Sequence, residues 1–221
     1  MKPRLTYFVS HPIQYQAPLL RWINQDPFCQ LKVIFERDFS SNDYFDRGFQ
    51  TTIGWDVPLR EGYESRLLAE VDVNAEIRSS DAIWLHGRGS HKLRKIIRRA
   101  SEFGKPVLMR GENCSFAMPD GRGLRKLIKR RYLHQIFEQC SGFLTIGSKN
   151  REYYLDYDIQ PDKLFDMPYA VDNIFFSSHA TDEKVFALRS SLGISPKDKV
   201  ILFAGKMTRR KNPYQLLNAW K

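Results

Sequence analysis

A loop near the end of the sequence concentrates positive charge where an anion could bind. It follows the apolar run at residues 200–204, which predicts a buried strand, and precedes a predicted helix over 213–220 that starts at a proline. The cations of this loop are Lys206, Arg209, Arg210 and Lys211. Open α/β sheets bind ligands at the carboxyl ends of their strands, and helix N-termini favour anions. The spacing therefore predicts a phosphate-binding loop, and the alternative is a solvated basic loop.

Imidazole, carboxylate and guanidinium groups follow predicted strands in the first half of the chain. If those strands are parallel, their carboxyl ends share one rim of the sheet. We expect this rim to carry His11, His86, Arg110 and Glu112 as catalytic candidates in one cleft, with Gln14 and Tyr15 facing an acceptor or donor phosphates. The alternatives are a structural Arg110–Glu112 ion pair, and hydrogen bonds by which His11 and Gln14 only hold their own loop.

Strand and helix patterns alternate along the chain. Apolar runs predict strands at 5–9, 31–35, 81–86, 106–109, 142–146 and 200–204. Amphipathic periodicity predicts helices at 92–103, 124–137, 150–157 and 183–192, and residues 37–68 form an aromatic-rich loop that is either functional or a local core. This order predicts an α/β fold, a doubly wound parallel-sheet Rossmann-like domain plus the first strand and helix of a second Rossmann-like domain.

Composition narrows the partners of the protein. The 221 residues carry a formal net charge of +10, which favours an anionic partner such as phosphate, nucleic acid or an acidic membrane surface. The three cysteines, Cys29, Cys114 and Cys140, lack metal-ligand spacing, so we expect reduced thiols, no metal and a cytoplasmic protein. No apolar run reaches the roughly 18 residues that a membrane span requires.

The two predicted helices at 92–103 and 124–137 combine apolar and basic residues. In each, the apolar face is expected to pack on the sheet, leaving a basic face that is either solvated or attracts anionic lipid. Six cations between residues 122 and 131 have no acidic residue among them, so we expect peripheral membrane association through the helix at 124–137. Nucleic acid is not expected as a partner, because the sequence contains neither zinc-ligand spacing nor an RNA-binding consensus.

Three segments resemble GT-B glycosyltransferases of the group 1 family, the family 4 type. They are Gly205-Lys-Met207 with a lysine five residues after Lys206, Thr145-Ile-Gly-Ser148, and Met167-Pro-Tyr-Ala-Val-Asp172. Two positions depart from the family pattern, since Ala170 and Asn212 each replace a usual glycine. Asparagine tolerates unusual backbone angles, but Pro213 offers no N–H to a phosphate, so phosphate contacts would have to come from neighbouring residues.

The resemblance implies a division of the chain and an activity. It implies an acceptor-binding domain over 1–175, a linker over 176–198, and over 199–221 the start of an incomplete nucleotide-sugar-binding domain, so that the chain is truncated early in that domain. The full enzyme would move a sugar from a nucleotide-sugar to a carbohydrate or lipid-linked acceptor in surface polysaccharide or glycolipid biosynthesis.

In that enzyme the anomeric configuration would be retained, without metal or cofactor, and Lys206 and Lys211 would hold the donor diphosphate, assisted by Arg209 and Arg210. The expected location is the cytoplasm, with peripheral binding at the inner face of the membrane. The rival interpretation is a non-catalytic module that binds an anionic or phosphorylated ligand.

Overall fold

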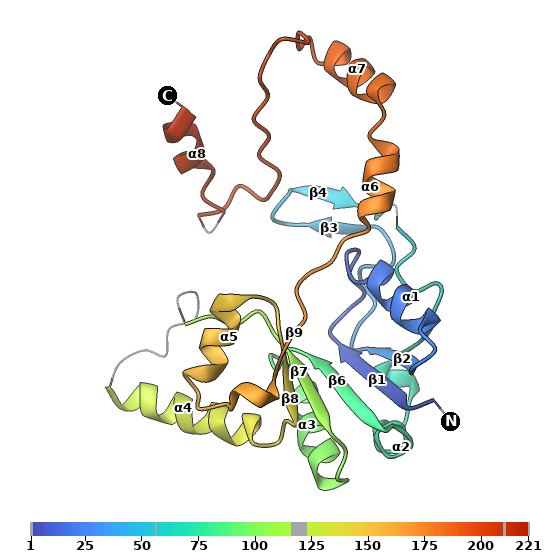
Figure 1. Ribbon diagram of the computed structural model, residues 1–221, viewed down its shortest axis with the longest axis vertical. Coiled ribbons are helices and arrows are strands. Elements are labelled where there is room, and N and C mark those ends of the chain that lie inside the picture. Colours follow the sequence, from blue (N-terminus) through green and yellow to red (C-terminus); the bar gives the residue numbers. More distant parts are fainter. Residues whose placement is uncertain (1, 56, 116–122, 210, 221) are drawn as a thin grey trace. The chain divides into compact units, whose positions relative to one another are not determined.

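A computed structural model describes residues 2–55, 57–115, 123–209 and 211–220 of the chain (Figure 1). Contacts divide the protein into two compact units. The first unit comprises Met1–Ser41 and Trp55–Ala170, and the second comprises Asn42–Gly54 and Val171–Lys221. The predicted boundaries at 175 and 198 stay a prediction.

The first unit alternates strands and helices. Its strands are β1 (Arg4–Val9), β2 (Gln30–Phe35), β5 (Glu64–Leu67), β6 (Ala82–His86), β7 (Val107–Arg110), β8 (Gly142–Thr145) and β9 (Leu164–Asp166). Its helices are α1 (Ala17–Gln25), η1 (Leu68–Glu70), α2 (Val73–Ser79), α3 (His91–Glu102), α4 (Gly123–Phe137), α5 (Ser148–Leu155) and η2 (Pro161–Lys163). The predicted doubly wound α/β domain is confirmed.

The seven strands form one parallel sheet in the order β5-β2-β1-β6-β7-β8-β9. From β1 the chain first adds strands on one side, β2 and β5, and then crosses to the other side with β6. The strand order therefore reverses between β1 and β6. In sheets of this kind, that reversal leaves a crevice outside the carboxyl ends of the two strands, where ligands bind.

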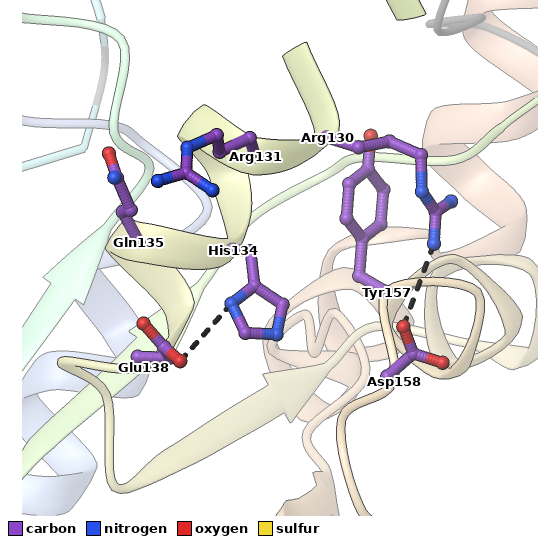
Figure 2. Close-up of a pocket in the computed structure, with 7 residues that line it drawn as sticks. All are labelled: Arg130, Arg131, His134, Gln135, Glu138, Tyr157 and Asp158. Carbon is purple, nitrogen blue, oxygen red and sulfur yellow. Dashed lines mark ion pairs between the residues drawn. The ribbon is translucent and has the colours of Figure 1, made fainter. Parts of the chain in front are cut away.

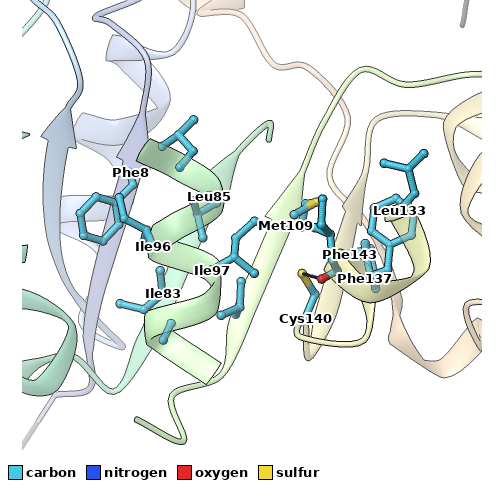
Figure 3. Packing of buried hydrophobic residues seen from close by; sticks show 14 of the residues in the cluster. Phe8, Ile83, Leu85, Ile96, Ile97, Met109, Leu133, Phe137, Cys140 and Phe143 are labelled. Atoms are coloured by element: carbon cyan, nitrogen blue, oxygen red, sulfur yellow. Dashed lines mark hydrogen bonds between the residues drawn. The ribbon is translucent and has the colours of Figure 1, made fainter. Parts of the chain in front are cut away.

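Two hydrophobic clusters cover the two faces of the sheet. The larger cluster joins strand residues such as Phe8, Leu85 and Phe143 to the apolar sides of α2, α3, α4 and α5. Figure 3 shows side chains of α3 and α4 directed at the strands in this cluster. On the other face Leu20 of α1 packs with strand residues that include Tyr7. Successive strand residues alternate between the clusters, as the period of two requires.

Helix α4 departs from the predicted packing. Only the second half of the helix, through Leu133, Ile136 and Phe137, reaches the core. Its first half exposes Leu124, Leu127 and Ile128, although the amphipathic pattern predicts that these residues pack on the sheet. These apolar residues do not pack on the sheet because they lie on the helix face opposite to the buried one.

The second unit contains β3 (Tyr44–Asp46), β4 (Thr51–Ile53), α6 (Asn173–His179), α7 (Asp182–Ser191) and α8 (Pro213–Trp220). Strands β3 and β4 form an antiparallel pair. The predicted helix at 213–220 is present, but the strand predicted at 200–204 is wrong, because these residues pair with no strand in the described part of the chain. An extended apolar segment becomes a strand only when a neighbour accepts its hydrogen bonds, and here Val200, Ile201 and Leu202 stay exposed.

Several elements lie where no regular structure is predicted. They are the β3–β4 pair, β5, α2, β9 and α6. Most are strands of three or four residues, too short to display a period. In the part of the chain that the structure describes, no helix is both long and apolar enough to cross a bilayer.

Candidate functional site

Strands β1, β6 and β7 are neighbours and end at the same rim of the sheet. His11 follows β1, His86 ends β6, and Glu112 follows β7 by two residues. Gly87 turns the chain away directly after β6, with a positive φ of 79° that favours glycine, and its N–H donates to the Arg110 carbonyl over 2.6 Å. The predicted residues therefore gather at the reversal point of the strand order.

Below the rim, buried partners hold the ring of His86. Its Nδ1 lies 3.0 Å from both Tyr7 Oη and Gln16 Nε2, and Tyr7 Oη also donates to Gln16 Oε1 over 3.1 Å. An amide nitrogen only donates, so Nδ1 of the neutral ring accepts and the ring proton resides on Nε2. Nε2 lies 3.8 Å from Glu112 Oε1. His86 thus presents its N–H toward the carboxylate.

Glu112 connects His86 to a second aromatic group. Its Oε1 accepts a hydrogen bond from the Tyr169 hydroxyl. The His86 ring, whose Nε2–H faces the carboxylate, contributes most to lowering the pKa of Glu112 to about 2. Burial opposes this effect, and the Tyr169 hydroxyl and the charge of Arg110 add to it. Burial, followed by the hydrogen bond to Glu112, raises the pKa of Tyr169 above its usual range. The pair therefore consists of a carboxylate and a neutral phenol.

Arg110 is buried beneath this pair rather than presented to a ligand. Its side chain is 1 % exposed, and Nη2 donates to the carbonyls of Met167 and Pro168 over 3.1 and 3.3 Å. The guanidinium also lies 4.8 Å from the centre of the Tyr169 ring. No ion pair joins Arg110 to Glu112, both of which the structure describes, so the alternative of a structural pair between them is wrong. The geometry favours Arg110 as the anchor of the 167–169 turn.

The loop after β1 places its predicted residues differently. Ser10 Oγ lies 2.9 Å from His11 Nδ1, and the His11 ring packs 4.7 Å from that of Phe39. Burial and then the charge of Arg37 lower the pKa of His11, so its imidazole is neutral at physiological pH. Tyr15 contacts the ring of Tyr169 edge-on at 5.1 Å.

Gln14 lies half-buried in the turn before α1. Tyr15 thus joins the rim through Tyr169, and Gln14 remains a predicted acceptor contact.

Three participants were not predicted from the sequence. Tyr7 and Gln16 resemble ordinary core and helix-start residues, and Tyr169 belongs to the motif that ends at Asp172 but has no polar sequence neighbour that would single it out. Tyr7 stacks on its register partner Trp84 with ring centres 3.8 Å apart. One signal in the sequence could have identified Tyr7: it is a tyrosine within a strand that borders the reversal of the strand order. We call His86, Glu112, Tyr169, Tyr7 and Gln16 the rim cluster.

The basic loop belongs to the second unit. Lys206 Nζ binds both carboxylate oxygens of Asp46, at 2.8 and 2.7 Å, and lies 5.1 Å from the centre of the Phe49 ring. Arg209 and Lys211 are exposed, and Arg210 lies outside the described residues. Lys206 therefore has an internal carboxylate partner, a contact that the sequence pattern did not predict.

Asn212 occupies the left-handed region at the end of this loop, with φ of 52°. Its N–H and that of Lys211 both donate to the Thr208 carbonyl over 3.0 Å. Asparagine adopts this conformation more readily than other side chains.

The rim cluster can orient a polar ligand more readily than it can remove a proton. A carboxylate with a pKa of about 2 is a weak base, while His86 uses Nδ1 below the rim and directs Nε2–H at Glu112. What remains is a fixed negative charge that can accept hydrogen bonds from hydroxyl groups. Such a surface suits a polyhydroxylated molecule.

Comparisons by sequence found no match, either among known family models or among curated proteins. Comparison of structures found HepE from Anabaena. Its complex with UDP has a TM-score of 0.56 at 10% identity, over 87% of this chain and 50% of that chain. The complex with UDP and glucose has a TM-score of 0.55 at 9% identity, over 86% of this chain and 50% of that chain. The complex with UDP-glucose has a TM-score of 0.54 at 11% identity, also over 86% of this chain and 50% of that chain.

This chain therefore spans about half the length of the HepE structures that it matches. At such low identity the likeness concerns the fold alone. The structural comparison thus shows that the chain has a doubly wound α/β fold, which it shares with part of HepE.

Proposed function

We propose that the chain is the acceptor-binding half, with the first part of the donor half, of a GT-B glycosyltransferase of the group 1 type. The complete protein would transfer a sugar from a nucleotide-sugar to a carbohydrate or lipid-linked acceptor during synthesis of surface polysaccharide or glycolipid. The observation that carries this proposal is the rim cluster, an ionised carboxylate at the reversal point of the sheet. The shared fold with HepE, whose structures contain UDP or UDP-glucose, supports the choice of a nucleotide-sugar donor.

In this proposal the rim cluster binds the acceptor. Glu112 accepts a hydrogen bond from an acceptor hydroxyl, while His86 and Tyr169 keep the carboxylate in place. Arg110 supports the same surface from below by holding the turn that carries Tyr169. Because Glu112 and His86 are poorly arranged to accept a proton, we assign them to positioning and binding.

The donor side is proposed for the basic loop. Lys206 and Lys211 would neutralise the leaving diphosphate, with Arg209 and Arg210 assisting, so that protein cations take the place of a metal ion. We further propose that the sugar keeps its anomeric configuration. The proposed location is the cytoplasm, at the inner face of the membrane, where a lipid-linked acceptor would be available.

The test is Glu112→Gln in the complete protein. Removing the charge weakens a charge-assisted hydrogen bond, so kcat/KM for the acceptor should fall about 10-fold to 100-fold, with KM for the nucleotide-sugar unchanged. Glu152→Gln is the matched control, because Glu152 is another glutamate with a side-chain partner, Lys149, but lies on the exposed side of α5.

Unchanged acceptor kinetics in Glu112→Gln would refute the assignment of the rim cluster. A complete protein that binds nucleotide-sugars but transfers no sugar to any acceptor would instead identify a non-catalytic binding module.

A further inference from the structure

The first half of α4 carries an apolar stripe that is exposed in the part of the chain that the structure describes. The stripe consists of Leu124, Leu127, Ile128 and Tyr132, whose exposed fractions range from 46 % to 71 %. Their spacing of three and four residues places them along one face of the helix. The core residues of α4 lie on the opposite face in its second half. The helix therefore has two apolar sides, and one of them packs into the core formed by the described residues.

Cations surround this α4 stripe. The stretch between residues 121 and 137 contains no acidic residue. Two hollows border the helix, and neither is lined by the rim cluster. One, of about 470 Å³, is lined by basic, polar and acidic residues of α4 and its neighbours: Arg130, Arg131, His134, Gln135, Glu138, Tyr157 and Asp158 (Figure 2). Within it Arg130 lies 3.7 Å from Asp158 and His134 lies 3.2 Å from Glu138, so Arg131 is the cation of this hollow without a carboxylate beside it among these residues.

The second hollow, of about 510 Å³, joins Tyr132 of the stripe to the basic side of α3. Its cations are Arg94, Lys95 and Arg98. The two helices thus present one continuous surface in which an aliphatic ridge has basic residues on both sides. Arg130 is fixed within it, since it stacks 4.9 Å from the Tyr157 ring and donates to the Asp156 carbonyl over 2.6 Å.

The chemistry of this surface selects among anionic partners. Nucleic acid or a soluble anion would satisfy the cations but would leave the aliphatic ridge in water. An anionic bilayer satisfies both, because the acyl boundary accepts leucine and isoleucine while the lipid phosphates attract lysine and arginine. A tyrosine at the end of the stripe suits the headgroup level, where aromatic residues with a polar end are enriched.

We propose that α4 docks on an anionic lipid surface with the α4 stripe inserted and the basic residues of α3 and α4 on the phosphates. This inference deepens the membrane location proposed above, because it adds apolar insertion to charge attraction and names the residues. It does not require sugar transfer, so the two proposals can fail separately.

Co-sedimentation of the full chain with vesicles tests the docking. The probes are vesicles of phosphatidylcholine alone and of phosphatidylcholine mixed with phosphatidylglycerol. The chain should bind the mixed vesicles and not the neutral ones, and Leu127→Ser/Ile128→Ser should lower the partition coefficient about tenfold or more. Arg125→Gln/Arg131→Gln should lower it by about tenfold, and high salt should weaken binding by the wild type.

Val185→Ser/Leu188→Ser is the matched control. Both residues are exposed apolar residues of α7, so this variant should bind like the wild type. All variants change exposed side chains, and circular dichroism confirms that each is folded. A tryptophan placed at the stripe, Ile128→Trp, should show a blue-shifted emission only with mixed vesicles, which reports insertion directly.

Four outcomes would overturn the proposal. They are no binding to either vesicle, equal binding to both, wild-type binding by Leu127→Ser/Ile128→Ser, and binding to duplex DNA that is lost in the same double variant. The assay contains no sugar donor or acceptor, so a failure of glycosyl transfer leaves its result unaffected.

Discussion

At the scale of single residues, the charge state of Glu112 decides what the rim cluster can do. Its low pKa arises mainly from the nearby His86 ring, although more than half of the side chain is exposed to solvent. The cluster is thus held ionised by a neighbour rather than by burial, which opposes the charge. Changes to that neighbour should be visible in the titration of the carboxylate.

We therefore predict that His86→Asn raises the pKa of Glu112 from about 2 toward the value of an ordinary glutamate, about 4.3. Carboxylate chemical shifts of labelled glutamate, followed by NMR as pH is lowered, measure it. Lys149→Gln, which removes the partner of another glutamate, should leave Glu112 unchanged. A Glu112 that titrates normally in the wild type would contradict the assigned effect of His86 on the carboxylate.

The same pKa predicts how stability depends on pH. The folded-state pKa lies below that of the unfolded chain, so Glu112 stabilises the fold fully above about pH 4.3. This contribution is lost as pH falls toward about 2. The difference in unfolding free energy between the wild type and Glu112→Gln should therefore shrink over that range. Urea denaturation at several pH values measures it, and a constant difference would contradict the linkage.

Arg110 is expected to matter for stability more than its position beside the rim suggests. Arg110→Met removes the charged donor that holds the carbonyls of Met167 and Pro168, and the loss of these two hydrogen bonds should lower the unfolding free energy by about 1.5 to 3 kcal/mol. Arg88→Met is a useful comparison, because Arg88 is less buried and bonds a single tyrosine hydroxyl. Equal stability of Arg110→Met and the wild type would remove the anchoring role.

At the scale of elements, α4 combines a buried half with an exposed one. Its second half packs Phe137 edge-on against Phe143 and Tyr157, with ring centres 5.4 and 5.5 Å apart. Its first half contributes little to that core. A single helix can combine both because its two apolar stripes lie on opposite faces and at different heights.

Two leucines of α4 give a matched test of this division. Leu133 is 4 % exposed and Leu127 is 64 % exposed. Leu133→Ala should therefore lower the unfolding free energy by about 2 to 5 kcal/mol, whereas Leu127→Ala should change it by no more than about 0.5 kcal/mol. Chemical denaturation distinguishes them. Similar losses in both variants would place Leu127 in the core and remove the basis for the α4 stripe.

At the scale of the whole molecule, the diphosphate-binding role proposed for the basic loop predicts a kinetic effect. If Lys211 stabilises the leaving diphosphate, Lys211→Ala in the complete protein should lower turnover on the order of 100-fold to 1,000-fold, and by more than it weakens acceptor binding. Lys199→Ala changes an exposed lysine of the same segment and should have no such effect. Steady-state kinetics measure both, and unchanged turnover in Lys211→Ala would leave the loop as a solvated turn.

Much of the first unit was predictable from local sequence. Buried strands such as β1, β6 and β7 are short apolar runs, and α3 repeats its apolar residues with a helical period. Each of these elements can therefore be recognised from a few consecutive residues. Parallel strands that alternate with helices must share one edge for their carboxyl ends. His11, His86 and Glu112 could therefore be assigned to one rim before any contact was known.

The tertiary structure alone decided which partners these groups have. Asp46 and Lys206 are 160 residues apart in the chain, and Glu112 pairs with His86 and Tyr169 instead of its near neighbour Arg110. Periodicity describes which side of an element is apolar, and it contains no information on which distant group will lie opposite. For the same reason the strand predicted at 200–204 lacks a partner, since strand formation depends on a second segment as well as on local sequence.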